Sequence, residues 1–303
     1  MRDGIININK AKNFTSHDVV YKIKKMLGKR VGHTGTLDPI ATGVLPICIG
    51  KATKISQYIL SQTKRYTATM LMGTTTDTLD ITGKILSQKN FIYNHNEILS
   101  TLNKFRGEYY QIPPMFSAIK KNGRKLYELA RDGINIEREK RLVNIFKLDF
   151  VNFVFPNKIV IDVKCSKGTY IRSLCDDIGN AIGCGACLFD LIRTECGQFS
   201  IDKSITLDEF ESLVDKNLAD EKIIKIENAL EFKKIFIDDY ANNFLYNGNK
   251  IDLKFVTGNK KIFADEKLLV FDCQKNLVGI YIRQDNFLKP LRMLLGDFDA
   301  NSK

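Results

Sequence analysis

Apolar segments of strand length recur along the whole chain, and segments with helical periodicity are set among them without regular alternation. A doubly wound parallel sheet needs a helix after nearly every strand, because parallel neighbours are joined by long crossover connections. The irregular order of strands and helices therefore predicts an α+β fold rather than a doubly wound one.

The same patterns predict where individual elements lie. Strands are expected at 4–10, 44–49, 66–72, 142–155, 158–164 and 188–201, and helices between Thr15 and Gly28 and at 52–60, 96–105, 125–131, 168–182 and 207–215. From residue 233 the pattern changes to short apolar bursts separated by Asn, Gly and Asp, which is typical of a small β domain. We therefore expect one domain over residues 1–232 and a second over 233–303.

The composition is that of an ordinary globular protein, with 303 residues of which 44% are hydrophobic and 27% charged. No stretch approaches the roughly 20 consecutive apolar residues that a transmembrane helix needs. The N-terminal segment is too polar for a secretory signal. A cytoplasmic protein without a membrane partner is expected.

Positive charge is concentrated in two blocks of the chain. The protein has 46 Lys and Arg against 35 Asp and Glu, a net charge of +11. Residues 1–66 contain 12 basic and 3 acidic residues, and residues 104–147 contain 11 and 5, whereas the segments between and after them are close to neutral. Such blocks favour a nucleic-acid partner. A membrane surface, an acidic protein or plain solvated helix faces are the alternatives.

Neither a disulfide framework nor a metal site is expected. The seven cysteines are odd in number and scattered, and the one close pair, Cys184 and Cys187, lacks a second pair or a nearby histidine. The glycine spacings of the common phosphate-binding loops are absent, so no nucleotide cofactor is implied.

A loop rich in Gly and Thr, residues 32–43, contains the strongest candidate for a catalytic group, Asp38. Asp38 precedes Pro39, which disfavours helical backbone, and the surrounding glycines allow unusual dihedral angles or close approach of a ligand. A carboxylate in this setting is a nucleophile or base, a metal ligand, or simply part of a turn.

This loop, Gly-His-Thr-Gly-Thr-Leu-Asp-Pro-Ile-Ala-Thr-Gly-Val-Leu-Pro over residues 32–46, resembles the active-site motif of the TruB family of tRNA pseudouridine synthases. Further segments resemble the family in the same order along the chain, at 64–66, 73–80, 113–131 and 165–172. The resemblance is strong over residues 4–200 and looser beyond. It implies the pseudouridine synthase fold, a central mixed, mainly antiparallel sheet flanked by helices, with a C-terminal domain of the PUA type.

The resemblance also implies a reaction. Enzymes of the family take the uridine at position 55 of the tRNA T-arm loop out of its stack and rejoin its uracil through C5, without a cofactor or metal. Asp38 would be the nucleophile, attacking either C6 of the base or C1′ of the ribose. Arg172 resembles the family arginine that pairs with this aspartate and stabilises its ionised form.

Further residues match positions that hold the flipped base and the RNA. Tyr66 would stack on the uracil and assist loss of the C5 proton, while His33 would fill the space that the base leaves. Tyr170 and Leu191 would line the uracil pocket. The segment 104–147 matches an insertion that closes over the T-arm. The residues expected to contact RNA, mostly phosphates, are Lys10, Lys64, Lys120, Lys121, Arg124 and Lys125.

The expected function is therefore that of a monomeric tRNA pseudouridine synthase acting on the T-arm stem-loop. One alternative is a guide-dependent or ribosomal RNA pseudouridine synthase of the same superfamily, and another is an RNA chaperone that folds tRNA. A metal-dependent nuclease built on Asp38, Asp77 and Asp80 is a third, weaker interpretation, because no larger carboxylate cluster accompanies these residues.

Overall fold

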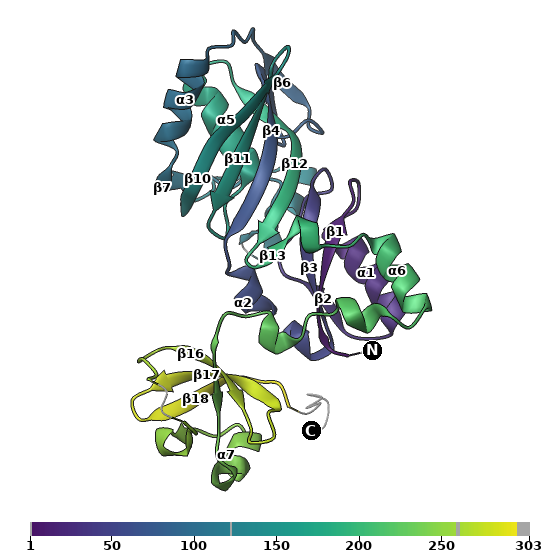
Figure 1. The fold of residues 1–303 in the computed structure, drawn as a ribbon. Helices are drawn as coiled ribbons and strands as arrows, with labels where there is room; N and C mark the ends of the chain where they lie inside the picture. Colours follow the sequence, from purple (N-terminus) through teal and green to yellow (C-terminus); the bar gives the residue numbers. More distant parts are fainter. Residues whose placement is uncertain (1, 122, 259–260, 296–303) are drawn as a thin grey trace.

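The protein is described by a computed structural model that covers residues 2–121, 123–258 and 261–295. Figure 1 shows a large sheet flanked by helices, with a second, smaller sheet at the C-terminal end of the chain. The α+β prediction is confirmed.

The large sheet is mixed and mainly antiparallel. Its strand order is β1-β3-β12-β4-β11-β10-β7, with β2 added beside β3 and β13 beside β12. The strands are β1 (Gly4–Lys10), β2 (Val31–His33), β3 (Thr42–Ile49), β4 (Lys64–Met72), β7 (Gly107–Gln111), β10 (Arg141–Val154), β11 (Lys158–Cys165), β12 (Ala186–Cys196) and β13 (Phe199–Ser200). One pair is parallel: β12 meets β3 with Arg193 opposite Gly43. This pair brings the end of the Asp38 loop beside a strand from much later in the chain.

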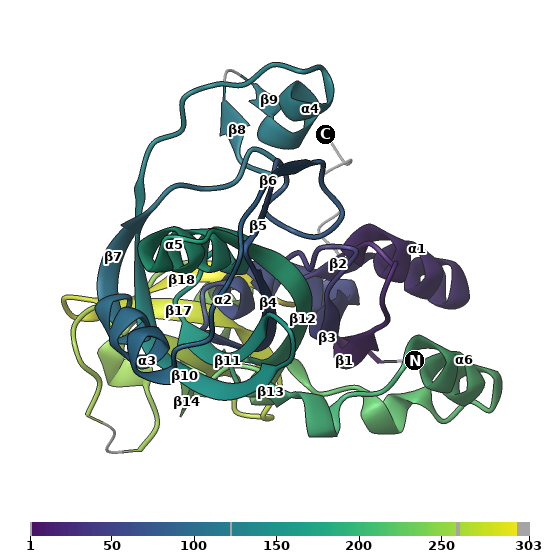
Figure 2. The same cartoon turned by 90° about the horizontal axis from the view of Figure 1, so that it is seen from above.

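Helices pack around the large sheet, as the two ribbon views show (Figures 1 and 2). They are α1 (Ser16–Leu27), α2 (Ser56–Leu60), α3 (His95–Lys104), α5 (Ile171–Ile182) and α6 (Leu207–Asp215), with 3₁₀ turns η1 (Gly50–Ile55), η2 (Ile201–Lys203), η3 (Ala219–Lys222) and η4 (Ile226–Asn228). The first helix has the expected ends. Thr15 caps it through Asp18, and Gly28 takes the left-handed conformation with φ 62°.

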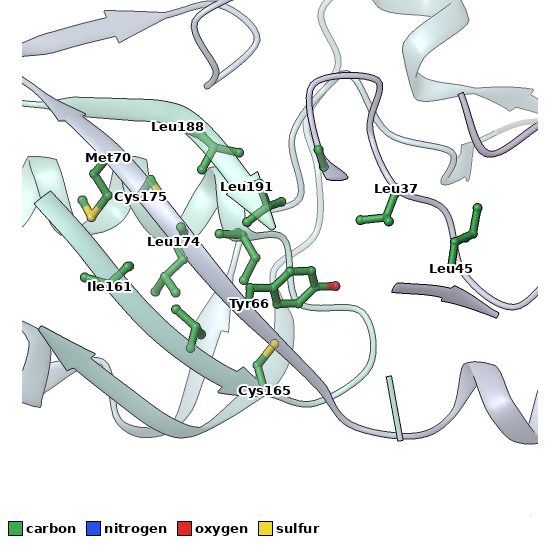
Figure 3. Close-up of a cluster of buried hydrophobic side chains, with 14 of the residues drawn as sticks. Leu37, Leu45, Tyr66, Met70, Ile161, Cys165, Leu174, Cys175, Leu188 and Leu191 are labelled. Carbon is green, nitrogen blue, oxygen red and sulfur yellow. The ribbon is translucent and has the colours of Figure 1, made fainter. Parts of the chain in front are cut away.

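The core of the large sheet follows the alternation of its strands. Every second residue of β4, from Lys64 through Tyr66 to Met72, points inward and is buried. Side chains from β11, β12 and α5 pack against this face, among them Ile161, Leu188 and Leu174 (Figure 3). Tyr66 lies at the edge of this cluster, with its hydroxyl directed toward the loop that carries Leu37.

Several predicted boundaries differ from the structure. The helix predicted from residue 168 begins at Ile171, because Gly168 has a φ of 80° that helical residues do not adopt. The strand predicted over 188–201 ends at Cys196, and a turn at Gly197, with φ 57°, leads into β13. The segment 73–80, for which no strand was predicted, contains a short strand, β5 (Thr74–Thr76), that pairs with β6 (Ile85–Gln88).

The segment between β7 and β10, which we call the lid, stands away from the sheet (Figure 2). It contains β8 (Lys120–Lys121), β9 (Arg124–Lys125) and α4 (Leu126–Arg131). A small apolar cluster centred on Met115, Leu126 and Leu129 holds it together. The lid thus has its own local core.

The C-terminal sheet has the order β14-β16-β17-β18-β15. Its elements are β14 (Lys233–Phe236), β15 (Ile251–Asp252), β16 (Lys267–Phe271), β17 (Leu277–Gln284) and β18 (Phe287–Met293), with η5 (Asp239–Ala241), α7 (Asn242–Tyr246) and η6 (Leu253–Phe255). One apolar cluster joins this sheet to the large one, since Leu269 and Ile280 pack in the same cluster as Val44 and Ile55. Across the described residues, no helix is long and apolar enough to cross a membrane.

The shared cluster predicts that the junction contributes to stability. We expect Leu269→Ala to lower the free energy of unfolding by about 2–4 kcal/mol, because the fully buried side chain leaves a cavity. Leu142→Ala, at a side chain that is 53% exposed, is the control and should cost less than about 1 kcal/mol. Denaturant titration measures both, and equal losses would contradict a packed junction.

Candidate active site

The loop that carries Asp38 is fastened to the start of α1. The buried hydroxyl of Ser16 accepts a hydrogen bond from the Leu37 N–H at 2.8 Å and donates one to the Leu37 carbonyl at 3.2 Å. The Asn13 N–H donates to the carbonyl of Pro39. Asp38 is therefore held on a fixed backbone, with its own side chain still 35% exposed.

Arg172, on the first turn of α5, pairs with this carboxylate. Its Nε lies 2.9 Å from Asp38 Oδ2, while only 6% of the arginine side chain is exposed. The buried guanidinium gives the carboxylate a charge-assisted hydrogen bond that fixes its position. The structure therefore brings together the predicted nucleophile and its predicted partner.

The rest of the Arg172 guanidinium is used by two other segments. Nη1 donates to the Thr78 carbonyl at 3.0 Å and lies 3.7 Å from Asp80 Oδ2. Nη2 donates to the carbonyl of Phe116, in the lid, at 2.8 Å. One side chain thus joins the Asp38 loop, the turn at 78–80 and the lid.

Asp80 is itself fixed by neighbouring residues. Its Oδ1 accepts hydrogen bonds from the Thr78 hydroxyl, the Thr82 N–H and the Thr82 hydroxyl. This leaves Oδ2 facing Arg172.

The alternative of a metal-dependent nuclease does not fit this geometry. The guanidinium of Arg172 lies between Asp38 and Asp80, where the metal ion would have to bind. Among the described residues no group of three or more His, Cys, Asp or Glu gathers as a metal site.

Apolar side chains border the site. Tyr66 and Leu191 are nearly buried and belong to the core cluster of the large sheet. Burial raises the pKa of Tyr66 to about 12, so its hydroxyl is protonated at neutral pH. In the free protein Tyr66 offers an aromatic face and a hydrogen-bond donor rather than a phenolate base.

Tyr170 is held through its backbone. Its N–H donates to Gln111 Oε1 at 2.8 Å, and Gln111 Nε2 donates to its carbonyl at 3.0 Å. Gln111, at the end of β7, therefore fixes the residue that precedes Arg172. Sequence reasoning missed Gln111, because nothing in its neighbourhood marks it.

His33, at the end of β2, is a neutral imidazole. Burial lowers its pKa to about 4. Its Nδ1 lies 3.3 Å from the Gly35 N–H, from which it accepts a hydrogen bond, so the ring proton is assigned to Nε2. The centroid of the His17 ring is 5.3 Å away. His33 thus presents an uncharged ring beside the Asp38 loop.

Two of the residues predicted to contact RNA, Lys10 and Lys64, have buried side chains. Lys10 is fully buried and donates to the carbonyls of Ala11 and Phe14, and burial lowers its pKa to about 8. Lys64 is also buried, and its amine donates to the carbonyls of Leu60 and Gln62. An ammonium enclosed by backbone carbonyls has no free face for a phosphate, so both lysines are structural.

The predicted contacts in the lid lie at its surface. Lys120 is exposed, Lys121 donates to the Glu137 carbonyl, and Arg124 pairs with Asp132. Lys125 is half-buried and lies over the ring of Tyr127. These four side chains are placed where an RNA could exchange for their present partners.

Sequence reasoning also missed Arg193, which is only 1% exposed. Its Nε donates to the Val44 carbonyl at 2.6 Å, and Nη2 donates to the Gly35 carbonyl at 3.2 Å. Its backbone lies directly opposite Tyr66 in the sheet. Arg193 therefore fastens both ends of the loop that carries Asp38. The signal was available, since Arg193 is two residues from Leu191 on a strand and so lies on the same inward face.

We expect Arg193→Met to lower the free energy of unfolding by about 2–4 kcal/mol, because it leaves buried carbonyl groups without donors. The control is Arg124→Met, whose side chain is 51% exposed and whose ion pair should contribute less than about 1 kcal/mol. Denaturant titration compares the two. Equal effects would contradict the proposed fastening of the loop.

The lowered pKa of His33 predicts a pH dependence of stability. Because the imidazole protonates near pH 4 when folded and near pH 6.5 when unfolded, its contribution is complete above pH 6.5 and is lost as pH falls toward 4. Between pH 7 and pH 4 we expect the free energy of unfolding of His33→Gln to fall by about 1–3 kcal/mol less than that of wild type. The comparison is thermal unfolding of both proteins from pH 7 to pH 4, with the exposed His95→Gln as control; parallel curves for wild type and His33→Gln would contradict it.

Family models match most of the large-sheet part of the chain. Residues 23–171 match the N-terminal domain of the TruB family of pseudouridylate synthases. Residues 172–231 match a C-terminal domain described for tRNA pseudouridylate synthase B. The boundary between the two matches falls at Arg172, so both contribute to the site.

Curated relatives and solved structures agree. A protein of Alkaliphilus oremlandii named tRNA pseudouridine synthase B is 43% identical over 96% of this chain and 98% of its own length. The protein of the same name from Clostridium tetani is 44% identical, covering 97% of this chain and 100% of the relative. A Cbf5-Nop10-Gar1 complex contains a chain with a TM-score of 0.75 and 25% identity, covering 96% of this chain and 85% of that one. The protein therefore belongs to the TruB family of pseudouridylate synthases and has the fold expected from the resemblance.

Proposed function

We propose that this protein converts the uridine at position 55 of the tRNA T-arm loop to pseudouridine, with Asp38 as the nucleophile. The observation that carries the proposal is the 2.9 Å pair of Asp38 with the buried guanidinium of Arg172. Relatives at 40–44% identity over nearly the whole chain are named tRNA pseudouridine synthase B. Their names supply the substrate class, and the site supplies the chemistry.

The reaction is an isomerisation. The bond between N1 of uracil and C1′ of ribose breaks, and a bond between C5 and C1′ forms. C5 loses its proton and N1 gains one, so no electrons are exchanged with an outside partner. Attack by the Asp38 carboxylate, at C1′ of the ribose or at C6 of the base, gives a covalent intermediate in which the uracil is free to turn.

The neighbouring side chains suit a flipped base. Tyr66 offers an aromatic face for stacking, and Leu191 supplies an apolar wall. Tyr170, which precedes Arg172 in the sequence, would add a second ring. The neutral ring of His33 can fill the gap in the RNA stack without bringing a charge among the bases. Arg172 holds the Asp38 carboxylate in place beside the base.

The lid is proposed to cover the T-arm stem-loop. Lys120, Lys121, Arg124 and Lys125 would then neutralise RNA phosphates. Arg172 donates to the Phe116 carbonyl, so binding at the lid and the position of the catalytic pair are physically linked.

We also propose that the chain is divided into a catalytic domain at 1–232 and a PUA-like RNA-binding domain at 233–303. The protein is proposed to act as a monomer in the cytoplasm.

The guide-dependent alternative has a specific observation behind it, the fold shared with the Cbf5 complex. Higher identity to relatives named tRNA pseudouridine synthase B favours the main proposal. Activity on an isolated T-arm stem-loop, with no added RNA or protein, distinguishes the two.

We expect Asp38→Asn to abolish release of tritium from tRNA that contains 5-tritiated uridine, because the amide is not a nucleophile. Wild type should release the label, and mapping of pseudouridine in a total tRNA pool should place it at position 55. Binding of tRNA by the variant should persist, since the side chain keeps its shape.

The matched control is Asp77→Asn, an exposed aspartate in the neighbouring turn whose Oδ1 accepts from the Lys84 N–H. Its amide keeps that acceptor, so turnover should stay within about twofold of wild type. Full activity of Asp38→Asn would refute the catalytic assignment. Restoration of tRNA folding by the inactive variant would indicate a chaperone function in addition.

A further inference from the structure

A cavity of about 580 Å³ lies between the two sheets, away from the Asp38 site. One wall is formed by the residue before β2 and by residues of η1 and α2, and the other by β18 of the C-terminal sheet. The apolar cluster that joins the two sheets includes Ala52 and Ile55 of η1, which are sequence neighbours of the lining residues Thr53, Lys54 and Ser56. The cavity is therefore a feature of the domain junction.

The cavity is lined by three cations and, among the described residues, by no carboxylate. Arg30 and Lys54 line one wall and Arg292 the other, and none of its nine lining residues in the described chain is acidic. The three cationic groups make no hydrogen bond or ion pair with any other described residue. By contrast, cations on the outer face of the large sheet, such as Arg65 and Lys147, are paired with carboxylates. Three free cations around a hollow attract an anion.

The other lining groups suit a nucleic-acid backbone. Thr53, Ser56 and Gln57 add hydroxyl and amide groups on the wall formed by η1 and α2. Pro290 and Leu291 add an apolar surface on the opposite wall. Phosphate oxygens accept from cations and amides, and a ribose ring packs on apolar groups, so the cavity offers partners for both parts of the backbone.

The cavity is directly connected to the Asp38 loop. Arg30 at the cavity directly precedes β2, which ends at His33 at the candidate site, a distance of about 10 Å for three residues of extended chain. α2 likewise leaves the cavity and ends at Leu60, whose side chain lies against Gly35. An RNA strand bound at one end of these elements is therefore close to the other end.

We propose that this junction cavity binds the sugar–phosphate backbone of the RNA substrate while the target base lies beside Asp38. The proposal rests on the tRNA pseudouridine synthase function proposed above. It assigns Arg292, and with it the C-terminal sheet, a direct part in substrate binding. Nothing in the catalytic pair itself depends on the three cations.

The test is the triple variant R30Q/K54Q/R292Q, with binding of full-length tRNA measured across salt concentrations. We expect the dissociation constant to rise at least tenfold near 0.1 M salt. The slope of log affinity against log salt should fall by about two to three, because each lost phosphate contact removes nearly one. The turnover number at saturating tRNA should match wild type, since the Asp38 site is untouched.

Two further variants control for charge and folding. K203Q/K216Q/K225Q removes the same charge at exposed positions outside the cavity and should bind tRNA as wild type does. R30K/K54R/R292K keeps the charges and should keep the salt slope. Thermal unfolding of all three variants checks that the fold is retained.

Binding of the isolated T-arm stem-loop and of inorganic phosphate is measured as well. Weaker binding of both RNAs by the neutral variant supports a contact within the stem-loop, and weaker binding of full-length tRNA alone supports a contact beyond it. If the neutral variant binds both RNAs with unchanged affinity and salt slope, the proposal is overturned. Binding of inorganic phosphate at the cavity in wild type would not rescue it, because it would then show an adventitious ion only. Pseudouridine formation by wild type reports separately on the proposed function, so the two failures are distinguishable.

Discussion

The guanidinium of Arg172 is the contact on which the arrangement of the site depends. It is almost excluded from water, and its nitrogens reach the Asp38 carboxylate, Asp80 with the adjacent Thr78 carbonyl, and the Phe116 carbonyl. A buried guanidinium is stable only when its donors are satisfied. Three segments that are distant in the sequence are therefore held together by the hydrogen-bond acceptors that one buried guanidinium requires, and the Asp38 carboxylate is one of these acceptors.

Positive charge in this protein serves two physically different purposes. Arg172, Arg193, Lys10 and Lys64 are buried, and backbone carbonyls accept most of their hydrogen bonds, so these cations organise loops around the site. The cations of the lid are at the surface and suit a polyanion. The net charge of a segment counts buried and exposed cations alike. The charge of residues 1–66 therefore predicts an RNA-binding surface, although some of these cations lie inside the protein.

Local signals explain what could be predicted from sequence. The helix between Thr15 and Gly28 has both of its ends encoded by short-range chemistry, so its limits were predicted correctly. Asp38 and Arg172 were found because each lies in a distinctive segment, but their contact, like the closeness of Asp80, depends on how distant segments pack. The inward position of Lys64 follows from its spacing to Tyr66 on the same strand, a signal that outweighs its charge. The role of Arg193 required the parallel pairing of β12 with β3, which no local pattern specifies.

That parallel pairing has a consequence for the order in which the enzyme is made. The donor that fastens the end of the Asp38 loop lies 149 residues downstream of the carbonyl it serves, and Gly43 approaches the Arg193 backbone so closely that a Cβ there would lie 2.3 Å from its carbonyl oxygen. During synthesis the nascent loop leaves the ribosome long before β12 exists, and such distant contacts form late. On the growing polypeptide the loop can make its contacts with Ser16 and Asn13, but its Val44 end gains the Arg193 donor only after β12 has been synthesised.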